Sequence, residues 1–353
     1  MKKATTYSFF ASLRMAILAL IALGGLTMCG KNDVVPDEED PWTELTGDQP
    51  IRFSSTLAAI ATKDPLDNNT TFGVFAFYQP GTSGSPGAWG SGSERTPNFM
   101  YNEDVLYSGG TYTYSPIKYW PNNSYNTISF WAYCPYTTNL DFFLNSSSGL
   151  YSKTTGDIPY IRFSVVNGDG SVDLMTSDIL KSLPKPNDNS PVHFTFHHVL
   201  SLIDINVKKQ DDAETPRFIV KLKSVRFDGI YQTGIIRRFD WNSLSDNDGN
   251  FTAFSGNQTL STSPSPLGGV MLIPQSFISN NAKLHVEYSI QHAGGVGPER
   301  PLACEALLSE VFEDGWEKNK HYTLNITIIP NDPIEFSVEW SDWGTVYNWH
   351  ITS

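Results

Sequence analysis

The stretch that decides the fold is residues 282–290, AKLHVEYSI, in which apolar and polar side chains alternate strictly. A period of two places every second side chain on the same face of a β-strand. One face of this strand carries Ala282, Leu284, Val286, Tyr288 and Ile290. The other face carries Lys283, His285, Glu287 and Ser289. The stretch therefore predicts a strand with one face in a core and the other in solvent.

Similar strand patterns recur along the chain and are separated by turn-rich tracts. Strands are predicted at 72–78, 126–136, 217–227, 321–329 and 334–340. Tracts rich in Gly, Pro, Asn, Asp or Ser lie at 79–93, 167–170, 245–250, 263–269 and 292–297. No long stretch has a clean helical period. Short strands divided by turn residues are typical of β-sandwiches, so we predict an all-β chain.

The predicted division between domains is the tract KSLPKPNDNSP at 181–191, which holds three prolines and has no apolar periodicity. A new pair of strands is predicted directly after it, in VHFTFHHVLSLIDINV at 192–207. We therefore place one β-sandwich at 47–188 and a second at 189–353. The length after residue 28 also suits two domains of ordinary size.

The N-terminus has the pattern of an export signal. Lys2, Lys3 and Arg14 precede Met15–Leu26, a run of 12 apolar residues and glycines. A membrane-spanning helix needs about 20 apolar residues, so this run is too short to span but suits a signal peptide. We predict a signal peptide at 1–28.

A cysteine ends this signal. The residues Leu26-Thr27-Met28-Cys29 resemble the lipobox of bacterial lipoproteins, although Met28 stands where Gly, Ala or Ser is usual. The resemblance implies a lipid on Cys29 that holds the mature chain at the outer membrane, with the acidic residues 29–46 as a tether. The alternative is a plain cleaved signal with an incidental cysteine.

The charge of the chain excludes some partners. The formal net charge is −13, and removal of residues 1–28 takes it to −16. Nucleic-acid binding needs a basic surface, so we expect no nucleic-acid partner.

Cys134 and Cys304 are predicted to be buried thiols rather than a disulfide, although export would permit oxidation.

The motifs of a reactive site are sparse. His193, His197 and His198 cannot share one ion on a regular strand, and we expect core or hydrogen-bonded histidines. The tract 245–250, SDNDGN, has a calcium-loop spacing in part, but Leu244 replaces the first ligand; a hairpin turn is the better interpretation. We predict no metal, no cofactor and no enzyme. A glycan hydrolase remains an alternative, since it needs only two carboxylates that meet in space.

The chain is rich in aromatic residues, with 21 Phe, 16 Tyr and 9 Trp. Large rings fill the space between the sheets of a sandwich, which is the favoured interpretation. Exposed rings also bind sugars, and Trp89 in the glycine-rich tract 79–93 is the candidate for that role. A surface lipoprotein that binds glycans and does not polymerise is therefore the second hypothesis.

Several segments, in order, resemble the fimbrillin-like proteins of Bacteroidales over about residues 50–345. The matching residues are Tyr119, Trp120, Pro121, Ala132, Tyr133, Pro135, Phe196, Leu272 to Gln275, and the segments 172–180, 321–328 and 341–344. The resemblance implies two tandem β-sandwiches of the transthyretin-like, fimbrillin type. It also implies a surface fimbria, whose subunits or tip adhesins join through β-strand complementation and contact a host protein or glycan.

In that family a protease removes the first strand of a subunit, and a C-terminal segment of another subunit replaces it. Here the first strand would be 51–61, and the loop after it carries Lys63 where the family has arginine. Cleavage at Lys63 would release Cys29 together with the strand, whereas an uncut chain would stay anchored as a base or an adhesin. The segment 343–353 is either the donor strand or the last strand of its own domain.

Overall fold

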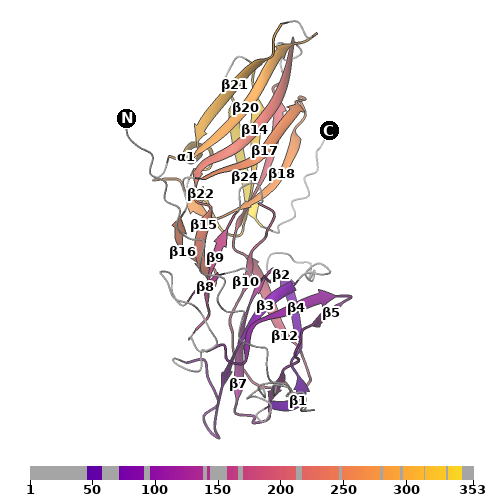
Figure 1. The fold of residues 1–353 in the computed structure, drawn as a ribbon, viewed down its shortest axis with the longest axis vertical. Helices are drawn as coiled ribbons and strands as arrows, with labels where there is room; N and C mark the ends of the chain where they lie inside the picture. Colours follow the sequence, from indigo (N-terminus) through magenta and orange to yellow (C-terminus); the bar gives the residue numbers. More distant parts are fainter. Residues whose placement is uncertain are drawn as a thin grey trace, which may run out of the picture. The chain divides into compact units, whose positions relative to one another are not determined.

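The computed structural model describes most of the chain after residue 45 (Figure 1). The described residues are 46–57, 71–90, 96–137, 141–143, 157–165, 170–211, 217–245, 249–278, 281–294, 297–313, 315–330 and 333–343. Almost every regular element in them is a β-strand, as predicted, and residues 44–353 group into one compact unit. In this part of the chain no helix has the length and apolar character needed to cross a membrane.

The largest sheet has eight strands and contains the first strand predicted from the sequence. Its order is β2 (Phe53–Leu57), β12 (Val192–His198), β10 (Met175–Ser177), β7 (Thr127–Cys134), β3 (Thr71–Gln79), β4 (Met100–Ser108) and β5 (Thr111–Thr113), with β11 (Leu180–Leu183) also on β7. β2 runs parallel to β12, and the other pairs are antiparallel. β2 thus lies at one end of the sheet.

Two four-stranded sheets form a sandwich around one core. The first has the order β18 (Ser265–Leu272), β13 (Ser201–Lys209), β23 (Lys320–Ile328) and β24 (Glu335–Asp342). The second has the order β17 (Gly249–Thr259), β14 (Phe218–Ile230), β20 (Lys283–His292) and β21 (Arg300–Leu307). The strand predicted from 282–290 is β20, and its apolar face is buried, which confirms the prediction.

Smaller elements complete the described fold. One further sheet has the order β16 (Asp240–Ser245), β15 (Thr233–Arg237), β9 (Tyr160–Ser164) and β8 (Asp141–Phe143). Two-stranded sheets join β1 (Thr46–Pro50) to β6 (Tyr119–Pro121) and β19 (Gln275–Ser276) to β22 (Gly315–Trp316). A single turn of helix, α1 (Leu308–Val311), follows β21.

The predicted division between 188 and 189 does not follow the sheets. β11, which overlaps the start of the proline-rich tract 181–191, and β12, which follows the tract, lie in the same eight-stranded sheet. β9 comes from before the tract and pairs with β15 from after it. The prolines of 181–191 therefore mark a connection within a sheet, and the strand at 192–198 does not open the second sandwich.

The tract 245–250 was expected to be a hairpin turn, and the structure corrects this. The strand before it, β16, pairs with β15, whereas the strand after it, β17, pairs with β14. The tract therefore connects strands of two different sheets. Residues 246–248 lie outside the described part of the chain.

Candidate assembly site

The first strand predicted from the sequence, at 51–61, corresponds to β2, which fills the end of the eight-stranded sheet. From Phe53 to Leu57, β2 pairs in parallel register with Val192 to Phe196 of β12. Side chains of this segment alternate: Ile51, Phe53 and Ser55 are buried, whereas Arg52 is exposed. Backbone pairing on one edge and alternate side chains in the core are the interactions by which a protein holds an added strand.

Phe53 is the apolar centre of this seam, and it lies among four other rings. The ring centroids are 5.2 Å from Tyr114, 5.7 Å from Phe194, 6.1 Å from Phe130 and 6.4 Å from Phe72. The partners come from segments far apart in sequence, and Phe53 contacts all four of them. Burial of a Phe or Ile side chain contributes about 1.5–3 kcal/mol, so Phe53 and Ile51 together hold the strand strongly.

Polar side chains close the seam on both sides of Phe53. The Tyr114 hydroxyl donates to the carbonyl of Ile51 at 3.0 Å, and the hydroxyls of Ser55 and Tyr112 lie 2.9 Å apart. On the outer face, the ring nitrogens of His193 lie 2.9 Å and 3.1 Å from the hydroxyls of Ser54 and Thr56. The contacts of Tyr114 and Tyr112 pair polar groups that lie at least partly buried and would cost free energy if left unpaired, whereas the His193 contacts are exposed to water.

Tyr114 gives the seam a pH dependence. Burial raises the pKa of Tyr114 to about 12, from 10.0 in an exposed tyrosine. Because the folded pKa is the higher one, the stabilisation is complete below pH 10 and is lost as the pH rises toward 12, by about 3 kcal/mol.

Replacement of Tyr114 by phenylalanine is therefore expected to cost about 1–2 kcal/mol at pH 9, because the Ile51 carbonyl loses its donor. The gap between variant and parent should shrink as the pH approaches 12. Urea unfolding at a series of pH values measures it. A gap that stays constant from pH 9 to 12 would contradict this assignment, since other tyrosines titrate in both proteins alike.

The C-terminal segment begins at a stacked pair of rings. The indole of Trp343 lies parallel to the imidazole of His198, with centroids 4.1 Å apart and 3° between the planes. The backbone N–H of Trp343 donates to Asn319 at 2.9 Å. Nδ1 of His198 is also 2.7 Å from Oδ2 of Asp173, a close polar contact rather than a straight hydrogen bond. Since His198 ends β12, the strand that holds β2 also holds the start of the C-terminal segment.

Truncation of Trp343 to alanine is expected to lower the free energy of unfolding by about 3 kcal/mol, because the ring is buried on His198. Trp340 is the matched control in the same segment. It is 64% exposed, and its ring receives the ammonium of Lys320 at 4.3 Å, so its truncation should cost about 1 kcal/mol or less. Denaturant unfolding of both variants gives the comparison. Equal losses of stability would refute the idea that Trp343 holds the start of the C-terminal segment on His198.

Most of the site residues that were predicted from the sequence lie outside the residues that the structure describes. Cys29, Lys63 and residues 344–353 of the C-terminal segment lie outside the described residues, as do 58–61 of the predicted first strand. Within the described part of that segment, residues 53–57 form a strand, β2, at the end of the eight-stranded sheet.

The histidines are hydrogen-bonded or packed, as predicted. His193 contacts Ser54 and Thr56, and Nε2 of His197 lies 3.2 Å from Oδ2 of Asp178. In the part of the chain that the structure describes, no group of His, Cys, Asp and Glu residues has the arrangement of a metal site.

Trp89, the candidate for sugar binding, is not a free ring. It is half-buried and packs edge-on against Phe77 with centroids 5.0 Å apart. Its backbone N–H donates to the hydroxyl of Ser182 at 2.7 Å. The glycine-rich tract thus covers the sheet with this ring, as the core interpretation of the aromatic residues predicts.

The two described cysteines are free thiols. Cys134 is buried, and burial raises its pKa to about 12. Cys304 is half-buried, which differs from the predicted full burial, because it lies on the edge strand β21. Burial also raises the pKa of Cys304, and because the thiolate is the nucleophile, both shifts lower the reactivity of these thiols at neutral pH.

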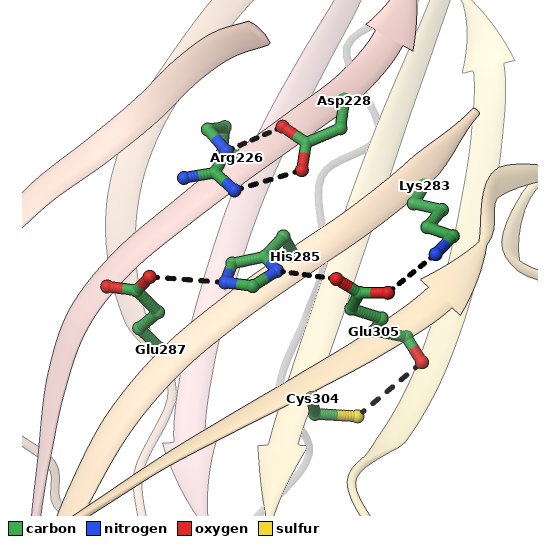
Figure 2. Close-up of polar contacts among 7 residues, drawn as sticks. All are labelled: Arg226, Asp228, Lys283, His285, Glu287, Cys304 and Glu305. Carbon is green, nitrogen blue, oxygen red and sulfur yellow. Dashed lines mark hydrogen bonds and ion pairs between the residues drawn. The ribbon is translucent and has the colours of Figure 1, made fainter.

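A charged network covers the outer face of the sheet formed by β14, β20 and β21 (Figure 2). The imidazole of His285 lies between Glu287 and Glu305, at 3.2 Å and 3.3 Å, and Lys283 contacts Glu305 at 2.6 Å. The Lys283 hydrogen bond lowers the pKa of Glu305. Ion pairs on an exposed strand face contribute little to stability, and we assign this network to solubility and strand register rather than to chemistry.

Sequence reasoning missed most of the residues that hold the first strand. Phe194, Tyr114 and His193 contact β2 from strands and loops more than 55 residues away along the chain. The available signal was the alternation of 192–198, VHFTFHH, which has the pattern of a half-buried strand but does not name its partner. The stacking of Trp343 on His198 had no sequence signal.

The fold and this seam define a class: all-β proteins of tandem sandwich type whose first strand sits at the end of a sheet. Residues 59–343 match the model of the fimbrillin-like family. Since the match covers most of the chain, the chain belongs to the fimbrillin-like family, which confirms the resemblance seen in its motifs.

Relatives and solved structures agree with this membership. The chain is 28% identical to a fimbrium subunit, Fim1C, of Phocaeicola vulgatus over 261 residues, which are 70% of this chain and 65% of that protein. The match thus spans slightly less than two thirds of that relative. A fimbrial protein from Bacteroides vulgatus ATCC 8482, known from a crystal structure, shares the fold, with a TM-score of 0.59 and 20% identity over 83% of this chain and 99% of that one.

Proposed function

We propose that this protein is a subunit or tip adhesin of a cell-surface fimbria, joined to other subunits by exchange of a β-strand. The observation that carries the proposal is the first strand, which lies at the end of the eight-stranded sheet with Ile51 and Phe53 in the core. The names of the matched relatives, a fimbrium subunit and a fimbrial protein, support the same role.

The physical step is replacement of one strand by another. Proteolysis after Lys63 would free residues up to 63, and departure of β2 would expose the rings of Phe194, Phe72 and Phe130 together with one edge of β12. Such a groove is costly in water, because it exposes apolar surface and unpaired backbone groups. A strand from another subunit would satisfy both, and this would drive assembly.

The route to the surface is part of the proposal. A lipid on Cys29 would deliver the chain to the outer membrane, and cleavage at Lys63 would separate the lipid from the subunit. If Lys63 is not cut, the chain stays anchored and serves as the base or an adhesin. The role in either case is structural and non-enzymatic.

The alternative of a glycan-binding lipoprotein that never polymerises loses its first candidate ring, because Trp89 packs on Phe77. Shearing of surface filaments from cells tests the two against each other. We expect this chain in the sheared fraction as multimers that dissociate only on heating. Its recovery solely as a monomer in the membrane fraction would reject polymerisation.

A further inference from the structure

An open pocket lies at one end of the sheet formed by β14, β20 and β21, and none of the residues drawn in Figure 2 lines it. It forms where β14 begins, β20 ends and β21 begins, and its volume is about 430 Å³. This volume lies within the range of small-molecule sites, about 300–1,000 Å³. Its lining includes Phe218, Ile290, His292, Pro298, Arg300 and Pro301.

Two rings form the apolar part of the pocket. The imidazole of His292 lies beside the ring of Phe218, with centroids 5.0 Å apart and an angle of 37° between the planes. His292 is exposed and Phe218 half-buried, so both rings are accessible from the pocket. A tilted pair of accessible rings offers flat apolar surface, which suits the C–H face of a sugar ring.

The lining of the pocket also holds one carboxylate, Glu299, which is paired with two lysines that lie outside the lining. Lys221 contacts Glu299 at 2.9 Å and Lys223 contacts it at 2.7 Å, while the Ser289 hydroxyl donates to it at 2.6 Å. These contacts lower the pKa of Glu299 to about 2, with the hydrogen bond from Lys223 as the largest cause, so this carboxylate is already paired with cations. Arg300 stands beside Glu299.

Arg300 is the group that remains available to a ligand. Its guanidinium has no ion pair or hydrogen bond among the residues that the structure describes, and it is exposed. A guanidinium binds a carboxylate through two parallel hydrogen bonds, which also fixes the orientation of the ligand. The protein as a whole has a net charge of −13. The positive charge of Arg300 therefore makes this place on its surface favourable for an anion.

We propose that this pocket binds an acidic sugar residue, with the sugar ring on Phe218 and His292 and its carboxylate on Arg300. A peptide is the less suitable ligand, because an extended peptide is held by backbone hydrogen bonds. Pro298 and Pro301 have no N–H to donate, and Pro301 is the second residue of the edge strand β21. The pocket is separate from the first-strand seam, so this site is independent of strand exchange.

The test compares two sugars that differ in one group. The full chain is titrated with methyl β-glucuronide and with methyl β-glucoside, and binding is followed by NMR shifts or saturation transfer. At low salt we expect millimolar binding of the glucuronide and about tenfold weaker binding of the glucoside, because one charge-assisted contact is absent. Absence of glucuronide binding, or equal binding of the glucuronide and the glucoside, would overturn the proposal.

Variants assign the contacts. Arg300→Gln is expected to weaken glucuronide binding about tenfold, down to that of the glucoside, whereas Phe218→Ala should weaken both sugars. Lys283→Gln removes the same charge from the same sheet outside the pocket and should leave binding within a factor of two. Unchanged affinity in Arg300→Gln, or an equal loss in Lys283→Gln, would show that the pocket does not hold the carboxylate.

Discussion

Lys63→Ala is expected to keep this protein as an uncleaved monomer that retains its N-terminal lipid, whereas we expect the parent to be processed and to assemble. The physical reason is that β2 occupies the place beside β12, with Phe53 among four rings, so no other strand can take that place while β2 remains there. Assembly then requires loss of this strand, and the loss requires a cut in the chain after it. The effect on multimers in sheared surface fractions should be close to all or none.

Lys63→Arg is the matched control. It keeps a cationic side chain at the cut, so a trypsin-like protease should process it like the parent, and an Arg-specific protease should process it better. Electrophoresis without heating separates monomers from multimers in each strain. Multimers of normal length in the Lys63→Ala strain would show that cleavage at this residue is not needed.

Phe53→Ala is expected to lower the free energy of unfolding by about 4–5 kcal/mol, near the upper end for truncation of a buried aromatic ring. The ring is 4% exposed and contacts Phe72, Tyr114, Phe130 and Phe194, so its removal leaves a cavity that four rigid rings cannot readily fill. The measurement is equilibrium denaturation of the uncleaved chain.

Arg52→Ala serves as control for Phe53→Ala, because Arg52 precedes it in the chain but points to solvent. An exposed substitution of this kind changes stability by about 0.5 kcal/mol or less. A loss below about 1 kcal/mol for Phe53→Ala would mean that the first strand is weakly held. The sheet would then lose little on departure of β2 and gain little from a replacement.

The alternation of apolar residues was enough to predict the all-β class and many of the strands, because strand faces buried on one side leave a period of two. β20 and β23 follow this rule, with buried and partly exposed residues in turn. β3 and β7 do not, because both of their faces are covered, and nearly every residue in them is buried. A pattern with a period of two, such as the one predicted at 126–136, therefore identifies only one of the two buried faces of β7.

Pairing between distant strands was beyond what the sequence patterns determine. The proline-rich tract 181–191 has the composition of a linker, yet it connects two strands of the same sheet. Composition reports local backbone freedom and says nothing of which edges meet. The local pattern was therefore enough to locate the first strand. Its partners β12, Tyr114 and Phe194 could be identified only from the structure.

The chemistry of the candidate site was predictable only in part. Cys29 and Lys63 were identified by resemblance, and both lie outside the described residues, so their roles stay predictions. Trp89 was selected because a tryptophan in a glycine-rich tract has the pattern of an exposed ring, but Phe77 and Ser182 hold it on the sheet. Burial of a single ring depends on distant partners that a local pattern does not contain.

The most direct test of strand exchange is the N-terminal residue of this chain in sheared surface filaments, determined by intact-mass and peptide mass spectrometry. If strands are exchanged, we expect subunits that begin directly after Lys63 and lack Cys29, Ile51 and Phe53. Filament subunits that begin at a lipidated Cys29 and retain the first strand would contradict it.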